Sequence, residues 1–191
     1  MKENNLETIV NNIVGDAIVK EVMSLKLAVK LIETVEEKAT EMGLAVVVAV
    51  SDAAGRPMAV HCMDGAYHGS FDVAVNKTYT STAFQMSTAK LSRLCQPGQD
   101  LYGLQFSNDG KVMILGGGEP LMVGKTMIGA LGVSGGSAQE DTDLAAYGAS
   151  ALKEVIKCLK MNAWYMTSYS RSWQICRLPE VYLVCMVCLR T

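Results

Sequence analysis

The feature that most constrains the fold is a β-branched apolar run over residues 44–50 (LAVVVAV), followed at once by a turn. Such a run favours a strand, and because no polar residue interrupts it, both faces of that strand should be buried. The turn is Asp52-Ala-Ala-Gly55, in which the Asp side chain can bond the backbone two residues on. Residues 57–63 then return as a second strand, so the pair forms a hairpin rather than a crossover unit.

Helical and strand patterns surround this hairpin. Apolar residues recur at helical spacing between Ser24, which can cap a helix, and Gly43, which can end it. Further helices are predicted at residues 70–84, 88–95 and 139–157, and further strands at residues 111–115, 119–123 and 126–134. The residues of helix 70–84 expected to face inward are Phe71, Val73, Ala74, Tyr79 and Ala83. Hairpins flanked by helices predict an α+β fold, in which helices cover an antiparallel sheet.

The chain of 191 residues divides into three parts. Residues 1–22 have the apolar stripe of an amphipathic helix, which either docks on its own domain or a neighbouring subunit, or is bound by a partner as an address helix. Residues 23–157 form the domain proper. Residues 158–191 hold both Trp and four of the six Cys, and we interpret this stretch as a lineage-specific extension or as non-native sequence.

Composition and charge exclude several classes of protein. The formal net charge is −2 and no run of Lys or Arg occurs, which argues against binding to nucleic acid. The longest apolar stretches are far shorter than the roughly 20 residues that span a bilayer, so no membrane insertion is expected. The N-terminus lacks the pattern of a secretory signal. We therefore expect a cytoplasmic protein whose cysteines are thiols.

Residues 63–70 (MDGAYHGS) join the end of a strand to the start of a helix, a place where side chains and backbone N–H groups can face a ligand. His61 and His68 are the only histidines, and each is either an ordinary surface or internally satisfied residue, a catalytic residue, or a ligand of a metal or a haem iron. Asp64 is either a turn residue or an anchor for a ligand. No Ser-His-Asp arrangement and no base for Cys95 can be identified, so catalytic residues stay unknown.

Two further positions have a structural and a functional interpretation. Lys77 is either a solvated cation or a partner for Asp64 or for an anionic ligand. Ser137 can cap the last helix, with Glu140 completing a capping box, and the free N–H groups there could also hold a carboxylate or a propionate. The run Gly116-Gly-Gly118 is similar to a phosphate loop only superficially, because it lies between strands and lacks the Gly-Lys-Ser/Thr ending.

Seven sequence blocks, in order, resemble the haem-binding GlcG/HbpS-like family, whose domain also occurs at the carboxy end of PduO-type corrinoid adenosyltransferases. The resemblance covers roughly residues 23–157. The blocks are residues 37–39 with Gly43, 48–55, 63–66 with Ser70, 77–80, 96–98 with 101–104, 116–121, and 128–136 with Asp141. The resemblance implies a profilin-like fold with an antiparallel five-stranded sheet flanked by helices, and it implies homo-oligomers.

The resemblance also implies a ligand, which is haem or a related tetrapyrrole or corrinoid. Axial ligation then falls to His61 or His68, with Asp64 nearby. An apolar wall for the ring could come from Met58, Val60 and Met63. Lys77 and Ser137 are the candidates for binding propionates.

Three functions remain open on the sequence. The first is an oligomeric accessory protein that binds haem or a corrinoid. The second is a small-molecule enzyme of diol or glycolate catabolism, with Asp64, Lys77 and His68 at a subunit interface. The third is a non-catalytic assembly protein recruited by its N-terminal helix. Residues 1–22 resemble the encapsulation peptides of bacterial microcompartments, which implies shell proteins as partners and the microcompartment lumen as a location.

Overall fold

The computed structural model of this protein describes residues 22–169, with side chains through residue 160. Predictions made for residues 1–21 and 170–191 lie outside this range. Contacts divide the chain into two compact units, with the boundary between Ile156 and Lys157. Within residues 22–169, no helix combines the length and the apolarity that crossing a bilayer requires.

The described chain is an α+β fold, as predicted. Its sheet is antiparallel throughout and has four strands in the order β2-β1-β4-β3. The elements in chain order are α2 (Leu25–Glu41), β1 (Val47–Asp52), β2 (Pro57–Cys62), α3 (Ser70–Phe84), α4 (Thr88–Leu94), the short 3-10 turns η1 (Leu104–Phe106) and η2 (Asn108–Gly110), β3 (Gly118–Val123), β4 (Thr126–Ser134) and α5 (Ala138–Tyr169).

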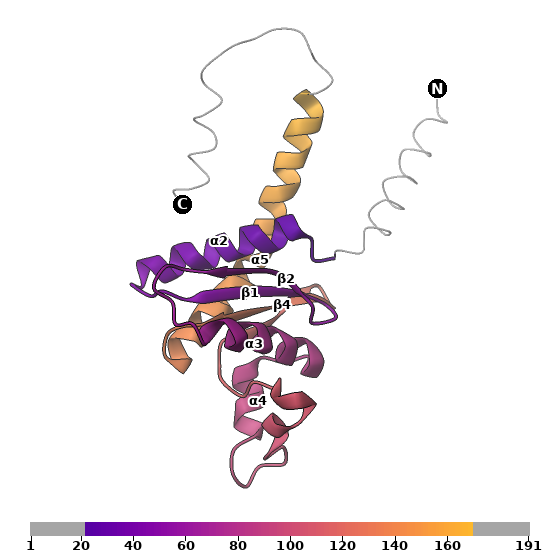
Figure 1. The fold of residues 1–191 in the computed structure, drawn as a ribbon. Coiled ribbons are helices and arrows are strands. Elements are labelled where there is room, and N and C mark those ends of the chain that lie inside the picture. Colours follow the sequence, from indigo (N-terminus) through magenta and orange to yellow (C-terminus); the bar gives the residue numbers. More distant parts are fainter. Residues whose placement is uncertain (1–21, 170–191) are drawn as a thin grey trace, which may run out of the picture. The chain divides into compact units, whose positions relative to one another are not determined.

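The predicted hairpin is present, and its first strand is the centre of the sheet. Val48 of β1 pairs with His61 of β2 on one side and with Val133 of β4 on the other. All residues of β1 from Val47 to Ser51 are buried, because the strand has neighbours on both edges and helices on both faces. Helix α2 lies over one face and α3 under the other (Figure 1).

The prediction of a fifth strand at residues 111–115 is wrong for the described chain, which has four strands in its sheet. The segment is instead bound to α3. The Thr80 hydroxyl accepts a hydrogen bond from the Met113 N–H at 2.8 Å, and Val112 is buried beside Leu91 and Cys95. The Met113 N–H is therefore bound by a side chain and is not available to pair with a neighbouring strand. The profilin-like arrangement implied by the resemblance stays a prediction.

The part of α5 before Lys157 covers the same face of the sheet as α2. A Cβ added to Gly148 of α5 would contact the side chain of Leu131 on β4, and would lie 2.7 Å from that of Val35 on α2. These three residues are buried and mark the point where the two helices approach the strand. The missing side chain of Gly148 is what lets α5 come so close.

Helix α3 packs on the opposite face with a mostly polar inner surface. Its buried residues are Ser70, Ala74, Lys77, Thr78, Thr80, Ser81 and Thr82. Its threonine hydroxyls donate hydrogen bonds to backbone carbonyls of the same helix, as Thr78 does to the Val75 carbonyl at 2.7 Å. Of the predicted inward residues Ala74 is buried, whereas Phe71 is 45% exposed, so helical periodicity indicated the wrong face for Phe71.

Residues after α3 build a small second core around α4. Leu91, Cys95 and Val112 are its buried members. Burial raises the pKa of the Cys95 thiol, which keeps it protonated near neutral pH. Cys95 is therefore a packing residue and not an activated nucleophile.

Candidate functional site

The β2–α3 loop holds the first group of candidate residues. It opens with a tight turn, in which the Ala66 N–H donates to the Met63 carbonyl at 3.0 Å and Gly65 has a φ of +87°. Asp64 stands at the first central position of this turn and is exposed. The turn is tied to the sheet, because the Met63 N–H donates to the Val46 carbonyl at 3.1 Å.

His68 lies in the second half of the same loop and is exposed. Its neighbour Tyr67 is 74% exposed, and Phe71, three residues on, is 45% exposed. The loop ends where the Ser70 N–H donates to the Tyr67 carbonyl at 2.9 Å, and α3 begins after Gly69 without a capping side chain. An imidazole and two large aromatic rings are thus open to solvent within one short segment. Exposed apolar groups gathered in this way are typical of a binding surface.

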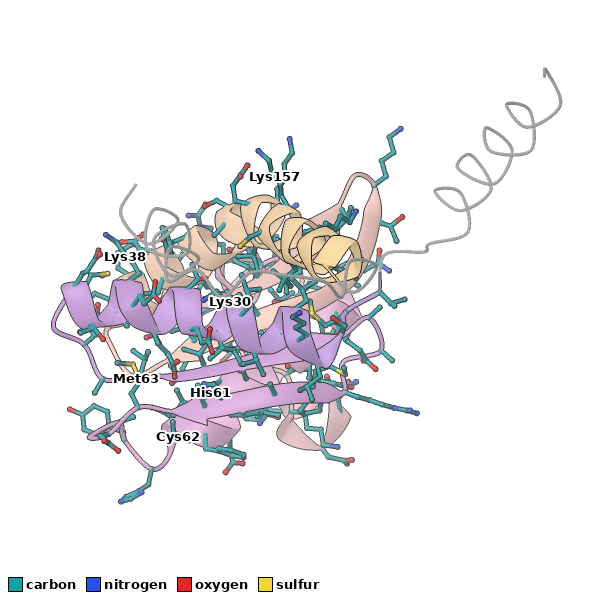
Figure 2. All side chains as sticks on the ribbon, turned by 90° about the horizontal axis from the view of Figure 1, so that it is seen from above. Lys30, Lys38, His61, Cys62, Met63 and Lys157 are labelled. Carbon is teal, nitrogen blue, oxygen red and sulfur yellow. The ribbon has the colours of Figure 1, made fainter. Side chains whose placement is uncertain are left out.

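His61 has a different setting, on β2 and toward α2. Its Nδ1 lies 3.2 Å and 3.3 Å from the two carboxylate oxygens of Glu36, and 37% of its side chain is exposed. A carboxylate oxygen only accepts, so Nδ1 is the donor in this pair, and in the neutral imidazole the free lone pair is then on Nε2. His61, Cys62 and Met63 follow one another at the end of the hairpin beside α2 (Figure 2).

Sequence analysis did not identify Glu36 as part of a site. It lies on the polar face of α2, 25 residues before His61, and only the register of β2 against α2 brings the two together. Among the described residues, no cluster of three or more His, Cys, Asp or Glu side chains could hold a metal ion. The pair alone therefore supplies one oriented imidazole and not a metal centre.

The predicted apolar wall does not flank His61. Val60 packs against the buried Ala74 and Val47 on the α3 side of the sheet. Successive strand residues point to opposite faces, so His61, next to Val60, points to the other face, toward Glu36 of α2. Met58 is the unpaired residue where the β1–β2 register shifts, between the pairs Val50–Ala59 and Ser51–Pro57. Met63 is half-buried at the end of the strand.

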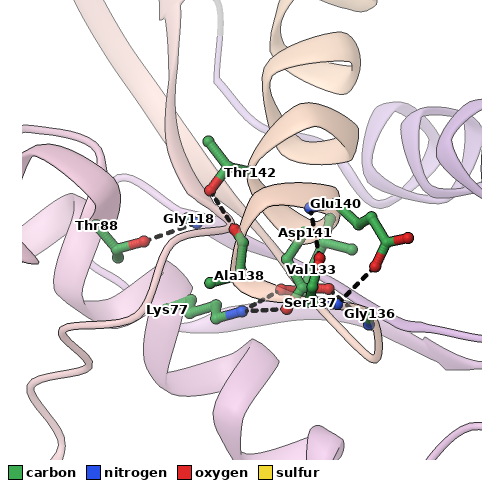
Figure 3. A network of polar contacts seen from close by, with 10 residues as sticks. All are labelled: Lys77, Thr88, Gly118, Val133, Gly136, Ser137, Ala138, Glu140, Asp141 and Thr142. Atoms are coloured by element: carbon green, nitrogen blue, oxygen red, sulfur yellow. Dashed lines mark hydrogen bonds and ion pairs between the residues drawn. The ribbon is translucent and has the colours of Figure 1, made fainter.

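Lys77 belongs to a second group, which is buried (Figure 3). Its Nζ donates to Asp141 Oδ2 at 2.7 Å and to the Val133 carbonyl at 2.6 Å, and the side chains of Lys77 and Asp141 are 1% and 6% exposed. Burial lowers the pKa of Lys77 by more than the hydrogen bond and charge of Asp141 raise it. The predicted pairing of Lys77 with Asp64 is wrong, because the partner is Asp141.

The other oxygen of Asp141 continues this network into the start of α5. Asp141 Oδ1 accepts from the Gly136 N–H at 2.9 Å. The predicted capping box is present: the Glu140 N–H donates to Ser137 Oγ at 3.3 Å, and the Ser137 N–H donates to Glu140 Oε2 at 2.8 Å. This backbone hydrogen bond from Ser137 is the main reason that the pKa of Glu140 is lowered. The N–H groups of Gly136 and Ser137 therefore already have carboxylate partners from their own chain.

Packing explains the glycine run at residues 116–118. A Cβ on Gly117 would lie 2.8 Å from Lys77 Nζ and 2.7 Å from the Val133 carbonyl oxygen. The Gly118 N–H donates to Thr88 Oγ1 at 2.9 Å, at the start of α4. The glycines of this run are thus explained by close packing beside the Lys77–Asp141 pair, and a phosphate-binding role is not needed to account for them.

Both groups of residues lie at one end of the sheet. A Cβ on Gly65 of the β2–α3 loop would lie 3.8 Å from Ala45 Cβ, and a Cβ on Gly135 after β4 would lie 2.6 Å from the Ala45 carbonyl oxygen. Ala45, just before β1, thus stands between the exposed loop and the buried network. The exposed loop is the part open to a ligand, and the buried network supports that end of the sheet.

A four-stranded antiparallel sheet between helices, with a histidine-bearing loop at one end, defines a small α+β domain with one exposed candidate site. The chain belongs to the HbpS-like family, described as "Haem degrading protein HbpS-like", whose family model matches residues 23–150. This confirms the family to which the sequence blocks pointed.

Three known proteins show the similarity in more detail. An uncharacterized 15.0 kDa protein from the dhaT–dhaS intergenic region of Citrobacter freundii is 39% identical over 123 residues, which are 64% of this chain and 87% of that protein. The corrinoid adenosyltransferase PduO of Salmonella typhimurium is 38% identical over 116 residues, 61% of this chain but only 34% of PduO. A crystal structure described as a PduOC:haem complex is 35% identical, with a TM-score of 0.65, and the match covers 68% of this chain and 94% of that one.

Proposed function

We propose that this protein is an accessory protein that binds haem, or a related tetrapyrrole or corrinoid, at its β2–α3 loop. The observation that carries the proposal is that His68, Tyr67 and Phe71 are all exposed within one five-residue segment. A family member has been crystallised as a haem complex, and the chain spans nearly all of that structure. The similarity to PduO, of which the chain spans about a third, is the support for a corrinoid.

The residues of the loop fit the chemistry of a haem. The iron needs a nitrogen donor with a free lone pair, which an exposed histidine offers. The porphyrin needs apolar surface against its faces, which Tyr67 and Phe71 offer. Met63 and Asp64, in the turn at the start of the loop, are the other residues of the proposed site. When bound, the haem would supply a redox-active iron, while this loop would supply the axial ligand and part of the apolar surface around the ring.

His61 is the rival axial ligand, since Glu36 leaves its Nε2 free. His68 is favoured because exposed aromatic residues occur in the same segment, whereas Val60, the neighbour of His61 on β2, packs on the opposite face of the sheet. Lys77 and Ser137 are left out of the proposed site, because each already has partners within the chain. The same geometry does not support an enzyme that uses Asp64, Lys77 and His68 together.

A second copy of the chain is the proposed cover for the exposed side of the ligand. Tyr67 and Phe71 alone leave much of a haem in water, and exposed aromatic rings of this kind are common in protein interfaces. A homo-oligomer in which the β2–α3 loops lie near an interface would remove both the haem and these two aromatic rings from solvent.

Titration of the purified full chain with hemin tests the proposal. We expect a Soret band whose intensity stops rising at a fixed ratio of hemin to protein. His68→Ala should weaken hemin binding by at least about tenfold, because it removes a ligand bond to the iron. The matched control is His61→Ala, at the other histidine, which should leave the Soret band in place.

The outcomes are distinct. Loss of the band in His61→Ala with retention in His68→Ala would move the ligand to His61. No band in the wild type at stoichiometric hemin would refute haem binding, and saturable binding of hydroxocobalamin in its place would make the ligand a corrinoid.

We also propose that residues 1–22 recruit the protein to a bacterial microcompartment shell. The support is the amphipathic pattern of that segment and its resemblance to encapsulation peptides. Pull-down with purified shell proteins tests this: the full chain should be retained, and a variant lacking residues 1–22 should be released. Equal retention of the two would refute the recruitment.

A further inference from the structure

The turn at the start of the β2–α3 loop contains an Asp–Gly bond, Asp64–Gly65. We propose that this bond is a site of spontaneous isomerisation, at which the normal peptide linkage converts to a β-aspartyl linkage. The proposal concerns the covalent chain and does not depend on which ligand the loop binds.

The chemistry requires only the chain and water. The Gly65 backbone nitrogen attacks the side-chain carbonyl carbon (Cγ) of Asp64 in its protonated form. A C–N bond forms, and the carboxyl OH leaves as water together with the proton of that nitrogen. The product is a five-membered cyclic imide. Water then adds to one of its two carbonyl carbons: attack at Cγ restores Asp64, and attack at the main-chain carbonyl leaves the chain running through Cγ. The mass of the protein is unchanged.

The structure leaves both reacting groups accessible. Asp64 and Gly65 are exposed, and within the described chain the Asp64 carboxylate has no hydrogen-bond or ion-pair partner. The Gly65 N–H likewise donates to no acceptor among the described residues. A glycine after the aspartate removes the side chain that would hinder the nitrogen, and the nearest heavy atom to a Cβ placed there is 3.8 Å away.

A second Asp–Gly bond, Asp109–Gly110, provides a comparison within the same chain. It is also exposed, but the Gly110 N–H donates to the Ser107 carbonyl at 3.0 Å. The residue before it, Asn108, is held by a hydrogen bond from its Nδ2 to the Tyr79 hydroxyl at 2.9 Å. The nitrogen of Gly110 has to give up a hydrogen bond before it can attack, whereas that of Gly65 does not. Asp64 should therefore react first.

Isomerisation at Asp64 would change the loop that follows. The extra methylene lengthens the main chain inside the turn closed by the Ala66 N–H and the Met63 carbonyl. That hydrogen bond positions the next residues, Tyr67 and His68, relative to the sheet. An aged molecule would therefore present these two side chains differently from a freshly folded one.

Peptide mapping of the full-length protein tests the proposal, without haem and so independently of haem binding. The chain is incubated at mildly acidic pH, where part of the aspartate is protonated and can lose water, at body temperature, then digested and analysed by electron-transfer fragmentation, which distinguishes β-aspartyl from aspartyl linkages. We expect the β-aspartyl product at Asp64 to accumulate about fivefold faster than at Asp109, the factor that one net hydrogen bond supplies.

The matched variant is Asp64→Glu, whose longer side chain would have to close a less favourable six-membered ring. It should remove the product at residue 64 and leave the rate at Asp109 unchanged. Equal or faster reaction at Asp109, or no β-aspartyl product at Asp64 when the rest of the digest is recovered, would overturn the proposal.

Discussion

Replacing Lys77 by Met should lower the free energy of unfolding by about 3–5 kcal/mol, the usual effect of removing one partner of a buried ion pair. The substitution leaves the Asp141 carboxylate, which is 6% exposed, without its cation. It also leaves the Val133 carbonyl without the hydrogen bond that Lys77 donates. Urea denaturation followed by far-UV circular dichroism measures the loss.

A double variant separates the charge from the packing. Burial lowers the pKa of Lys77 despite the hydrogen bond and charge of Asp141, and replacing both members of a buried ion pair by apolar residues is often neutral or stabilising. Lys77→Met combined with Asp141→Leu should therefore recover a large part of the stability that Lys77→Met alone loses. The exposed Lys90→Met on α4 is the control and should change stability by less than about 0.5 kcal/mol. A loss of similar size in Lys90→Met and Lys77→Met would contradict this account of the buried pair.

Replacing Gly132 by Ala should also destabilise the protein, by roughly 2–4 kcal/mol, because added atoms in a tightly packed region force the backbone apart. A Cβ at this position in β4 would contact the Ala74 carbonyl oxygen of α3 and would lie 2.9 Å from Thr78 Cγ2. The first of these is a backbone atom of a helix and cannot rotate away. Thermal unfolding of the variant measures the effect.

The control for this experiment is Gly69→Ala. Gly69 has an ordinary φ of −66°, and a Cβ there would meet no heavy atom within 4 Å. The same chemical change should therefore have almost no effect on stability at residue 69. If Gly132→Ala were as stable as Gly69→Ala, the close approach of α3 to β4 would not be a determinant of this fold.

Features that depend on neighbouring residues were predictable from the sequence. The hairpin of β1 and β2 follows from a β-branched run and a turn with Asp and Gly at fixed positions. The helix cap at Ser24, whose hydroxyl accepts from the Leu27 N–H, and the Ser137–Glu140 capping box are equally local. The blocks that identify the family are also read along the chain, and the family match over residues 23–150 agrees with them.

Features that depend on distant contacts were not predictable. Lys77 meets Asp141 across 64 residues, and the order of the strands had to be known before that partner could be chosen. Phe71 was expected to face inward, yet α3 turns its small polar residues to the sheet. Gly132 and Gly118 let α3 approach the strands so closely that only small side chains fit between them.

The sequence by itself thus determined the hairpin, the helix starts and the place of the histidine-bearing loop, because short-range sterics and hydrogen bonds set them. Only the tertiary structure decided that residues 111–115 stay out of the sheet, that Glu36 orients His61, and that Lys77 is buried while His68 is exposed. Those outcomes depend on which faces and edges come together. Register and packing set them jointly for the whole domain, and no local pattern of residues encodes them.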